Sequence, residues 1–191
     1  PRSRPTSTER GPDVPLDHLW ATWRSAYVTA SGQGRSTPAG PDRSGGAATG
    51  SLFERILASG EPDSETGIVV RGEHCFVLLN RFPYTSGHLM VLPNRAVAEL
   101  EGLDAGEFAE LWALVRSAVV ALKGGLGCDA VNVGINLGVA AGGSQSDHLH
   151  VHCVPRWVGD ANFMSVAAET RVLPVPLDEA RSRLLDVWPH P

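Results

Sequence analysis

Residues 144–157 read Ser-Gln-Ser-Asp-His-Leu-His-Val-His-Cys-Val-Pro-Arg-Trp, and this stretch places histidines at three alternate positions. The three histidines are His148, His150 and His152. Side chains alternate between the two faces of a β-strand, so a strand over residues 147–157 would carry all three on one face. The residues that alternate with them are apolar and would enter the core: Leu149, Val151 and Cys153. We therefore predict a strand with a row of imidazoles.

Function explains this histidine row better than packing does. Imidazoles that become protonated together repel one another, so it is costly to gather them. The row nevertheless holds three of the seven histidines of the chain. Two uses remain open, a metal site and a nucleophilic site.

A metal site is limited by the length of the row. Neutral imidazole is the commonest zinc ligand, and histidines two residues apart can share an ion. On a strand, however, His148 and His152 would lie about 13 Å apart, at roughly 3.3 Å per residue, so one ion cannot bind both. Asp147 is the only nearby acidic residue, and its side chain would face the other way. We expect neither a metal ion nor another cofactor.

In the second use, the central His150 is a nucleophile. A neutral imidazole attacks phosphorus through one nitrogen when a hydrogen-bond acceptor holds the other. The row is preceded by small and polar residues: Gly142, Gly143, Ser144 and Gln145. Their backbone N–H groups, with the serine hydroxyl, suit phosphate oxygens. A glycine pair alone is more often a plain loop, but its place just before the histidines favours a phosphate site.

The rest of the domain reads as strands joined by short turns, with one long helix. The turn-like Gly72-Glu73 separates the β-type runs 68–71 and 75–80, which predicts an antiparallel hairpin. After Asp104 apolar residues recur every three or four positions, which predicts a helix that ends at Gly124-Gly125. Further strands are expected over residues 88–92 and 131–135, and shorter helices over 52–57 and 176–188. This order favours an α+β fold with a mostly antiparallel sheet.

The N-terminal quarter of the chain has a different composition. Residues 1–13 have little to bury and are expected to be a disordered leader. Residues 14–29 carry leucines and aromatics at helical spacing and predict an N-terminal helix. Residues 30–50 are rich in Gly, Ser and Pro and predict a flexible loop. The catalytic domain is expected over residues 51–191.

Composition narrows the classes of partner and compartment. The 191 residues carry a net charge of −5, which disfavours broad binding to nucleic acid or membrane surfaces. The three cysteines are widely spaced in apolar sequence, as is typical of reduced thiols rather than a disulfide framework. No apolar run is long enough to span a membrane. We expect a cytoplasmic protein that binds neither nucleic acid nor membrane.

The residues of the row, together with others, resemble the histidine triad (HIT) family of nucleotide hydrolases and transferases. His148-Leu-His-Val-His-Cys-Val154 is similar to the family's defining His-φ-His-φ-His-φ-φ signature, where φ is apolar. Residues 80–93, Asn-Arg-Phe-Pro-Tyr-Thr-Ser-Gly-His-Leu-Met-Val-Leu-Pro, resemble its second hallmark. Residues 136–144 and 155–163 are similar to the diadenosine tetraphosphate (Ap4A) phosphorylase branch. The resemblance covers roughly residues 51–188.

The resemblance implies a HIT-like fold, a reaction and a set of site residues. The fold is a five-stranded, mostly antiparallel sheet flanked by helices, usually in a homodimer. The substrate would be a nucleotide or dinucleoside polyphosphate such as Ap4A, cleaved by hydrolysis or phosphorolysis through a nucleotidyl-His150 intermediate. His148, His152 and His88 would orient His150 or contact phosphate. The remaining carried-over positions are Asn80 for ribose and Asn136, Gly143 and Ser144 for phosphates.

The sequence also departs from the family pattern. Many relatives carry a Cys-Pro-Phe-Cys zinc element where this chain has Ser51-Leu-Phe-Glu54, and Ala96 replaces a common histidine. These changes imply that no structural metal binds there, and they leave the nucleotidyl chemistry intact. Two alternatives therefore stay open: a nucleotide-binding regulator with little turnover, and a specialised enzyme of secondary metabolism with a different nucleotide substrate.

Overall fold

The computed structural model describes residues 50–142, 145–160 and 173–189. The chain divides into two units, residues 1–47 and 48–191, and every described element lies in the second. The leader, the N-terminal helix and nearly all of the loop expected over residues 1–50 therefore lie outside the described residues.

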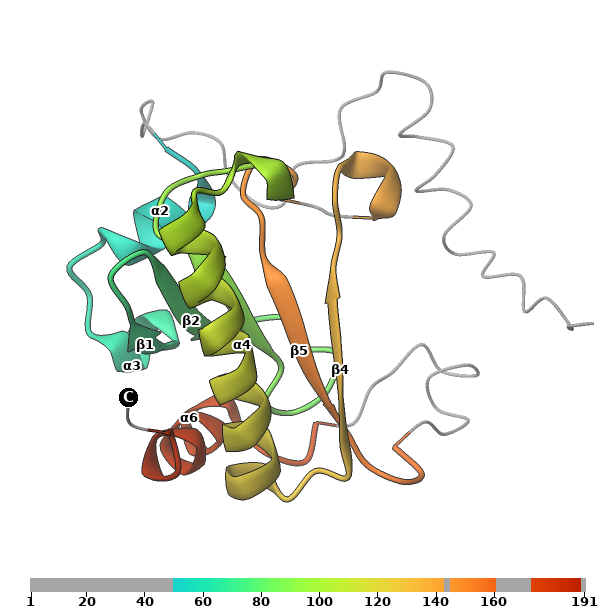
Figure 1. Cartoon of the computed structure of the whole chain (residues 1–191). Coiled ribbons are helices and arrows are strands. Elements are labelled where there is room, and N and C mark those ends of the chain that lie inside the picture. The colour runs from blue at the N-terminus through green and yellow to red at the C-terminus, as the bar shows by residue number, and fades with distance from the viewer. Residues whose placement is uncertain (1–49, 143–144, 161–172, 190–191) are drawn as a thin grey trace, which may run out of the picture. The chain divides into compact units, whose positions relative to one another are not determined.

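A five-stranded sheet forms the centre of the described unit (Figure 1). Its strands are β1 (Ile68–Arg71), β2 (Cys75–Leu79), β3 (Leu89–Pro93), β4 (Ala130–Ile135) and β5 (Val151–Arg156). They lie in the order β1-β2-β3-β5-β4, and each neighbouring pair is antiparallel. This arrangement confirms the predicted α+β class and the predicted hairpin.

Helices and short helical turns connect the strands. They are α2 (Leu52–Leu57), α3 (Asp63–Thr66), η1 (Leu100–Gly102), α4 (Ala105–Leu126), η2 (Val139–Ala141) and α6 (Leu177–Asp186). The helix α4 begins at a capping box between Asp104 and Glu107, in which each side chain accepts from the other residue's backbone N–H. No helix in the described part of the chain is long and apolar enough to cross a membrane.

The predicted end of α4 at Gly124-Gly125 is wrong, because the helix continues to Leu126 and is capped by Gly127 in the left-handed conformation. Gly125 instead permits close packing of α4 on α6. A Cβ atom at Gly125 would lie 2.6 Å from the carbonyl oxygen of Arg183. The two helices meet beside the sheet at the C-terminal end of α4 (Figure 1).

The two faces of the sheet bury different groups. The helix α4 packs on one face, where its Leu111 and Leu122 join strand residues such as Val91 in the main core cluster. A smaller cluster on the opposite face includes Phe53 from α2 and Met90 from β3. Since neighbouring residues of a strand point to opposite faces, these two clusters define an α4 face and a Phe53 face.

The strand that carries the histidines starts later than predicted. β5 begins at Val151, so His148 and His150 precede it and only His152 of the three lies within it. Before Val151 the backbone leaves the ladder, because Leu149 N donates to Val97 O beyond the end of β3. The predicted alternation of faces holds nevertheless, since the three apolar residues between and after the histidines enter the main core: Leu149, Val151 and Cys153.

Candidate active site

Four histidines gather on the Phe53 face of the sheet. The ring centroids of His150 and His152 lie 4.8 Å apart, and those of His88 and His152 lie 5.1 Å apart. The Phe53 ring contacts both His148, at 5.4 Å, and His150, at 5.5 Å. His88 is the residue before β3. Because β3 pairs with β5, His88 lies beside His152, which is 64 residues away in the chain.

His150 is held in one orientation by the backbone. Its Nδ1 lies 2.8 Å from the carbonyl oxygen of His148. A carbonyl oxygen only accepts hydrogen bonds, so Nδ1 must carry the proton and donate. In the neutral ring, Nε2 then bears the lone pair, and it has no hydrogen-bond partner among the described residues. In its neutral form, His150 therefore presents an Nε2 lone pair whose direction is set by the hydrogen bond at Nδ1.

His88 and His152 form a second chain of hydrogen bonds. The backbone N–H of Tyr84 donates to His88 Nδ1 at 3.2 Å, so His88 Nδ1 is unprotonated and His88 Nε2 carries the hydrogen. That Nε2 lies 3.0 Å from His152 Nδ1 and donates to it. The proton of a neutral His152 must therefore sit on its Nε2. This nitrogen is buried and finds no hydrogen-bond partner within the described part of the chain.

Burial keeps His152 uncharged. Desolvation, with a smaller contribution from the neighbouring His150, lowers the pKa of His152 to about 4. At neutral pH the ring is therefore a neutral donor whose N–H group has no protein acceptor among the described residues. Such a group suits an oxygen of a bound phosphate.

His148 is used entirely within the protein. Its side chain is fully buried, with Nε2 2.9 Å from Pro93 O and Nδ1 2.6 Å from the hydroxyl oxygen of Ser51. Desolvation lowers the pKa of His148 below its usual value. Both ring nitrogens of His148 thus have protein partners, and its carbonyl oxygen accepts from His150 Nδ1.

The residues at the zinc-element positions come together but do not suit a metal ion. Ser51 binds His148, and the carboxylate of Glu54 accepts from the backbone N–H groups of Ala96, at 2.9 Å, and Ser51, at 2.8 Å. A structural zinc site needs thiolate, imidazole or carboxylate ligands, and neither Ser51 nor Ala96 supplies one. Among the described residues, no three His, Cys, Asp or Glu side chains are grouped so as to hold a metal ion.

The positions predicted to bind nucleotide are only partly described. Asn80 follows β2; its Oδ1 accepts from Phe82 N at 2.9 Å and its amide nitrogen lies 3.3 Å from His88 Nδ1. Asn136 directly follows Ile135, the last residue of β4, which pairs with Val151 next to His150. Gly142 and Gln145 lie in the loop before the histidines, whereas Gly143 and Ser144 are outside the described residues.

Several residues that sequence reasoning missed belong to this site. Gly134 pairs with His152 across β4 and β5, so the two share a face, and a Cβ atom at Gly134 would meet nothing within 4 Å. Open space therefore lies beside the histidines. The alternation of polar or small residues in β4 is a local signal for Gly134. No local signal exists for Ser51, which lies 97 residues from its partner His148.

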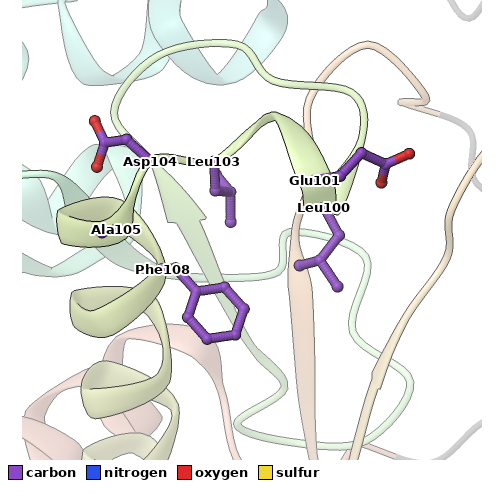
Figure 2. A pocket seen from close by; sticks show the side chains of 6 residues that line it. All are labelled: Leu100, Glu101, Leu103, Asp104, Ala105 and Phe108. Carbon is purple, nitrogen blue, oxygen red and sulfur yellow. The ribbon is translucent and has the colours of Figure 1, made fainter.

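A hollow of about 500 Å³ lies elsewhere and contains none of the predicted site residues. It opens beside the start of α4, where the side chains of Leu100, Leu103 and Phe108 point toward a common space (Figure 2). Glu101 and Asp104 stand at its edge with their carboxylates directed away. The hollow is apolar, and no cluster of ionisable groups points into it.

Comparison with known proteins gives consistent matches. The HIT domain family model matches residues 61–158. The AP-4-A phosphorylase of Mycobacterium tuberculosis is 39% identical over 173 residues, which are 91% of this chain and 85% of that protein. The bis(5'-nucleosyl)-tetraphosphatase [asymmetrical] of Schizosaccharomyces pombe is 37% identical over 82 residues, 43% of this chain and 44% of the other. The solved structure of a zinc-bound histidine triad family protein from Mycobacterium smegmatis superposes with a TM-score of 0.59 at 26% identity, covering 72% of this chain and 92% of that one.

Proposed function

Because this chain belongs to the HIT family, we propose that it is an enzyme that cleaves a nucleoside polyphosphate, such as Ap4A, through a covalent nucleotidyl-His150 intermediate. The observation that carries the proposal is the hydrogen bond from His150 Nδ1 to the His148 carbonyl, which leaves the lone pair on Nε2. The M. tuberculosis protein, named a phosphorylase, and the S. pombe protein, named a tetraphosphatase, support this class of substrate.

The reaction proceeds in two displacements at one phosphorus atom. The Nε2 lone pair of His150 forms a bond to the α-phosphorus, while the bond from that phosphorus to the bridging oxygen breaks and the polyphosphate leaves with the electron pair. The His148 carbonyl stabilises the positive charge that develops on the His150 ring. Water or inorganic phosphate then attacks the same phosphorus and releases His150 with its lone pair restored.

His152 has a separate role in this scheme. Its Nε2–H donates to a phosphate oxygen and stabilises negative charge as the oxygens crowd around phosphorus. His88 fixes this direction of donation, because its Nε2–H donates a hydrogen bond to His152 Nδ1. Hydrogen-bond donors that the protein orients before the substrate binds stabilise the transition state more than water does, because they need not reorganise during the reaction.

The neighbouring loop and strand ends complete the proposed nucleotide site. Asn136, which follows the residue paired with Val151, and the loop from Gly142 through Gly143 and Ser144 to Gln145 would bind phosphates. Asn80 would bind a ribose. The empty space above Gly134 supports this placement, because it leaves room on the same face of the sheet.

The covalent intermediate gives a direct test. Wild-type protein and His150→Ala are incubated with Ap4A, with and without inorganic phosphate, quenched in alkaline denaturant because a phosphorus–nitrogen bond hydrolyses in acid, and analysed by mass spectrometry. We expect an AMP adduct on wild type alone and turnover lowered at least about a thousandfold in the variant. Phosphate-dependent release of ADP would identify a phosphorylase, and AMP release in water a hydrolase. Equal turnover by the two proteins would remove His150 as nucleophile, and tight nucleotide binding without an adduct would favour the regulator.

We also propose that the protein is a cytoplasmic homodimer. Phe108 and Trp112 of α4 are 47% and 38% exposed, and their rings contact each other at 6.2 Å. Val133 of β4 is also exposed. It lies on the α4 face of the sheet, because its neighbours along the strand face away from α4. Exposed aromatic and strand residues of this kind support an interface. The three cysteines are all buried and free, which supports a reducing compartment.

A further inference from the structure

The start of α2 is joined to the histidines by a closed ring of hydrogen bonds, here called the Ser51 ring. From Ser51 Oγ the ring runs to His148 Nδ1, 2.6 Å away, and from His148 Nε2 to Pro93 O, 2.9 Å away. Three residues after Pro93, Ala96 N donates to Glu54 Oε1 at 2.9 Å. Glu54 Oε2 accepts from Ser51 N at 2.8 Å and closes the ring.

The direction of each hydrogen bond in the Ser51 ring is determined by its partners. Pro93 O only accepts, so His148 Nε2 carries a proton, and in the neutral ring Nδ1 is an acceptor. Ser51 must therefore donate its hydroxyl proton to Nδ1. The same hydroxyl oxygen accepts from Glu54 N at 3.1 Å, as the N-cap of α2. The Ser51 hydroxyl thus accepts a hydrogen bond at the start of α2 and donates one to His148.

The position of His148 is transmitted to His150. The His148 carbonyl accepts from His150 Nδ1, and Leu149 N is bonded to Val97 O at 2.6 Å, so both sides of this short segment are anchored. Phe53, two residues after Ser51, packs against the rings of both histidines. Movement of the His148 ring would therefore disturb the carbonyl that orients the nucleophile.

We propose that Ser51 is a positioning residue, which donates to His148 Nδ1 and so holds the His148 ring in place, and which through the His148 carbonyl aligns His150 Nε2 with phosphorus. Glu54 supports it by tying the start of α2 to the end of β3. The kinetic part of this inference rests on the proposed function. The tautomer of His148 does not, because it follows from the contacts alone.

The kinetic test separates the donated proton from the helix cap. Ser51→Gly deletes the hydroxyl but keeps an acceptable N-cap residue, whereas Ser51→Thr keeps both hydroxyl and cap. We expect Ser51→Gly to lower kcat for Ap4A about tenfold with KM changed less than about twofold, because alignment is lost and substrate binding is kept. Ser51→Thr should restore most of kcat. Asp104→Gly, which removes the side-chain cap of α4 far from the histidines, should leave kcat unchanged.

A spectroscopic test is independent of turnover. In ¹⁵N NMR of the imidazoles, wild-type His148 should show an unprotonated Nδ1 and a protonated Nε2. Ser51→Gly should keep this tautomer, which Pro93 O fixes, but should shift the Nδ1 resonance, because that nitrogen loses its hydrogen-bond donor. A protonated Nδ1 in the wild type, or an unchanged kcat in Ser51→Gly, would overturn the proposal. If the wild type forms no adduct on His150, the proposed function fails, and the NMR result alone then decides the role of Ser51.

Discussion

At the scale of single residues, Gly134 leaves open space beside the histidines, where we propose that the nucleotide binds. It shares a face with His152, and a side chain there would project into open space without meeting the protein. We expect the series Gly134→Ala, Val and Leu to lower kcat/KM for Ap4A progressively, by roughly tenfold or more at Leu, because the added atoms exclude the nucleotide.

Stability measurements form the control for this series. Since the added Cβ meets no neighbour, the urea midpoint should stay close to the wild-type value in all three variants. A leucine variant with undiminished kcat/KM would show that the nucleotide lies elsewhere.

The buried state of His152 makes a prediction for acid stability. Its pKa is about 4 in the folded protein against about 6.5 when unfolded, so below pH 6.5 the unfolded chain binds more protons. Stability is therefore fully present above pH 6.5 and is lost as the pH falls toward 4, by at most about 3 kcal/mol. His148, whose pKa is also lowered, acts in the same direction. Urea unfolding at several pH values should show a shallower loss for His152→Gln, and equal slopes would contradict this assignment.

At the scale of elements, Glu110 joins α4 to the β1–β2 hairpin. Its carboxylate accepts from three consecutive backbone N–H groups of the turn, those of Glu73, His74 and Cys75. We expect Glu110→Ala to lower the free energy of unfolding by about 1–3 kcal/mol, because the turn loses its acceptor. Urea denaturation measures this loss. Glu61→Ala, at an exposed position, should change it by less than about 0.5 kcal/mol, and a similar small change for Glu110→Ala would be inconsistent with the bridge.

Local periodicity predicted the elements well and their ends less well. Apolar alternation located β4 to within one residue, and the three- to four-residue spacing located α4, because those patterns report directly on which side chains are buried. Gly125 was mistaken for a terminator, since close packing against α6 and helix termination both select glycine. The first residue of β5 depends on where its pairing with β3 and β4 begins. The local sequence pattern does not contain this information.

The site likewise has features that the local sequence predicts and features that it does not. The alternation of histidines predicted which face His150 and His152 share, and their rings lie side by side. The tautomers of His152 and His148 depend on partners distant in sequence: His88, 64 residues from His152, and Pro93, 55 residues from His148. A serine at the start of a helix has the same local signature whether it caps that helix alone or also binds a histidine.

At the scale of the whole molecule, the exposed aromatic residues of α4 predict the oligomeric state. Trp112→Glu should convert a dimer to a monomer, because a charge would be buried in an apolar interface. Sedimentation or light scattering should show half the wild-type mass. Val158→Glu, at a side chain that is 93% exposed and lies two residues beyond the end of β5, should leave the mass unchanged. A monomeric wild type would refute the homodimer.

The pairing of Ser51 with His148, 97 residues away, also bears on the order of events in folding. Contacts between such distant residues form only after the intervening chain has been brought together, so they are slow to appear. In refolding experiments, helical circular dichroism should return before catalytic competence does. A fragment that ends before residue 148 keeps Ser51 and Glu54 but lacks His148 and His150, so it cannot form the Ser51 ring.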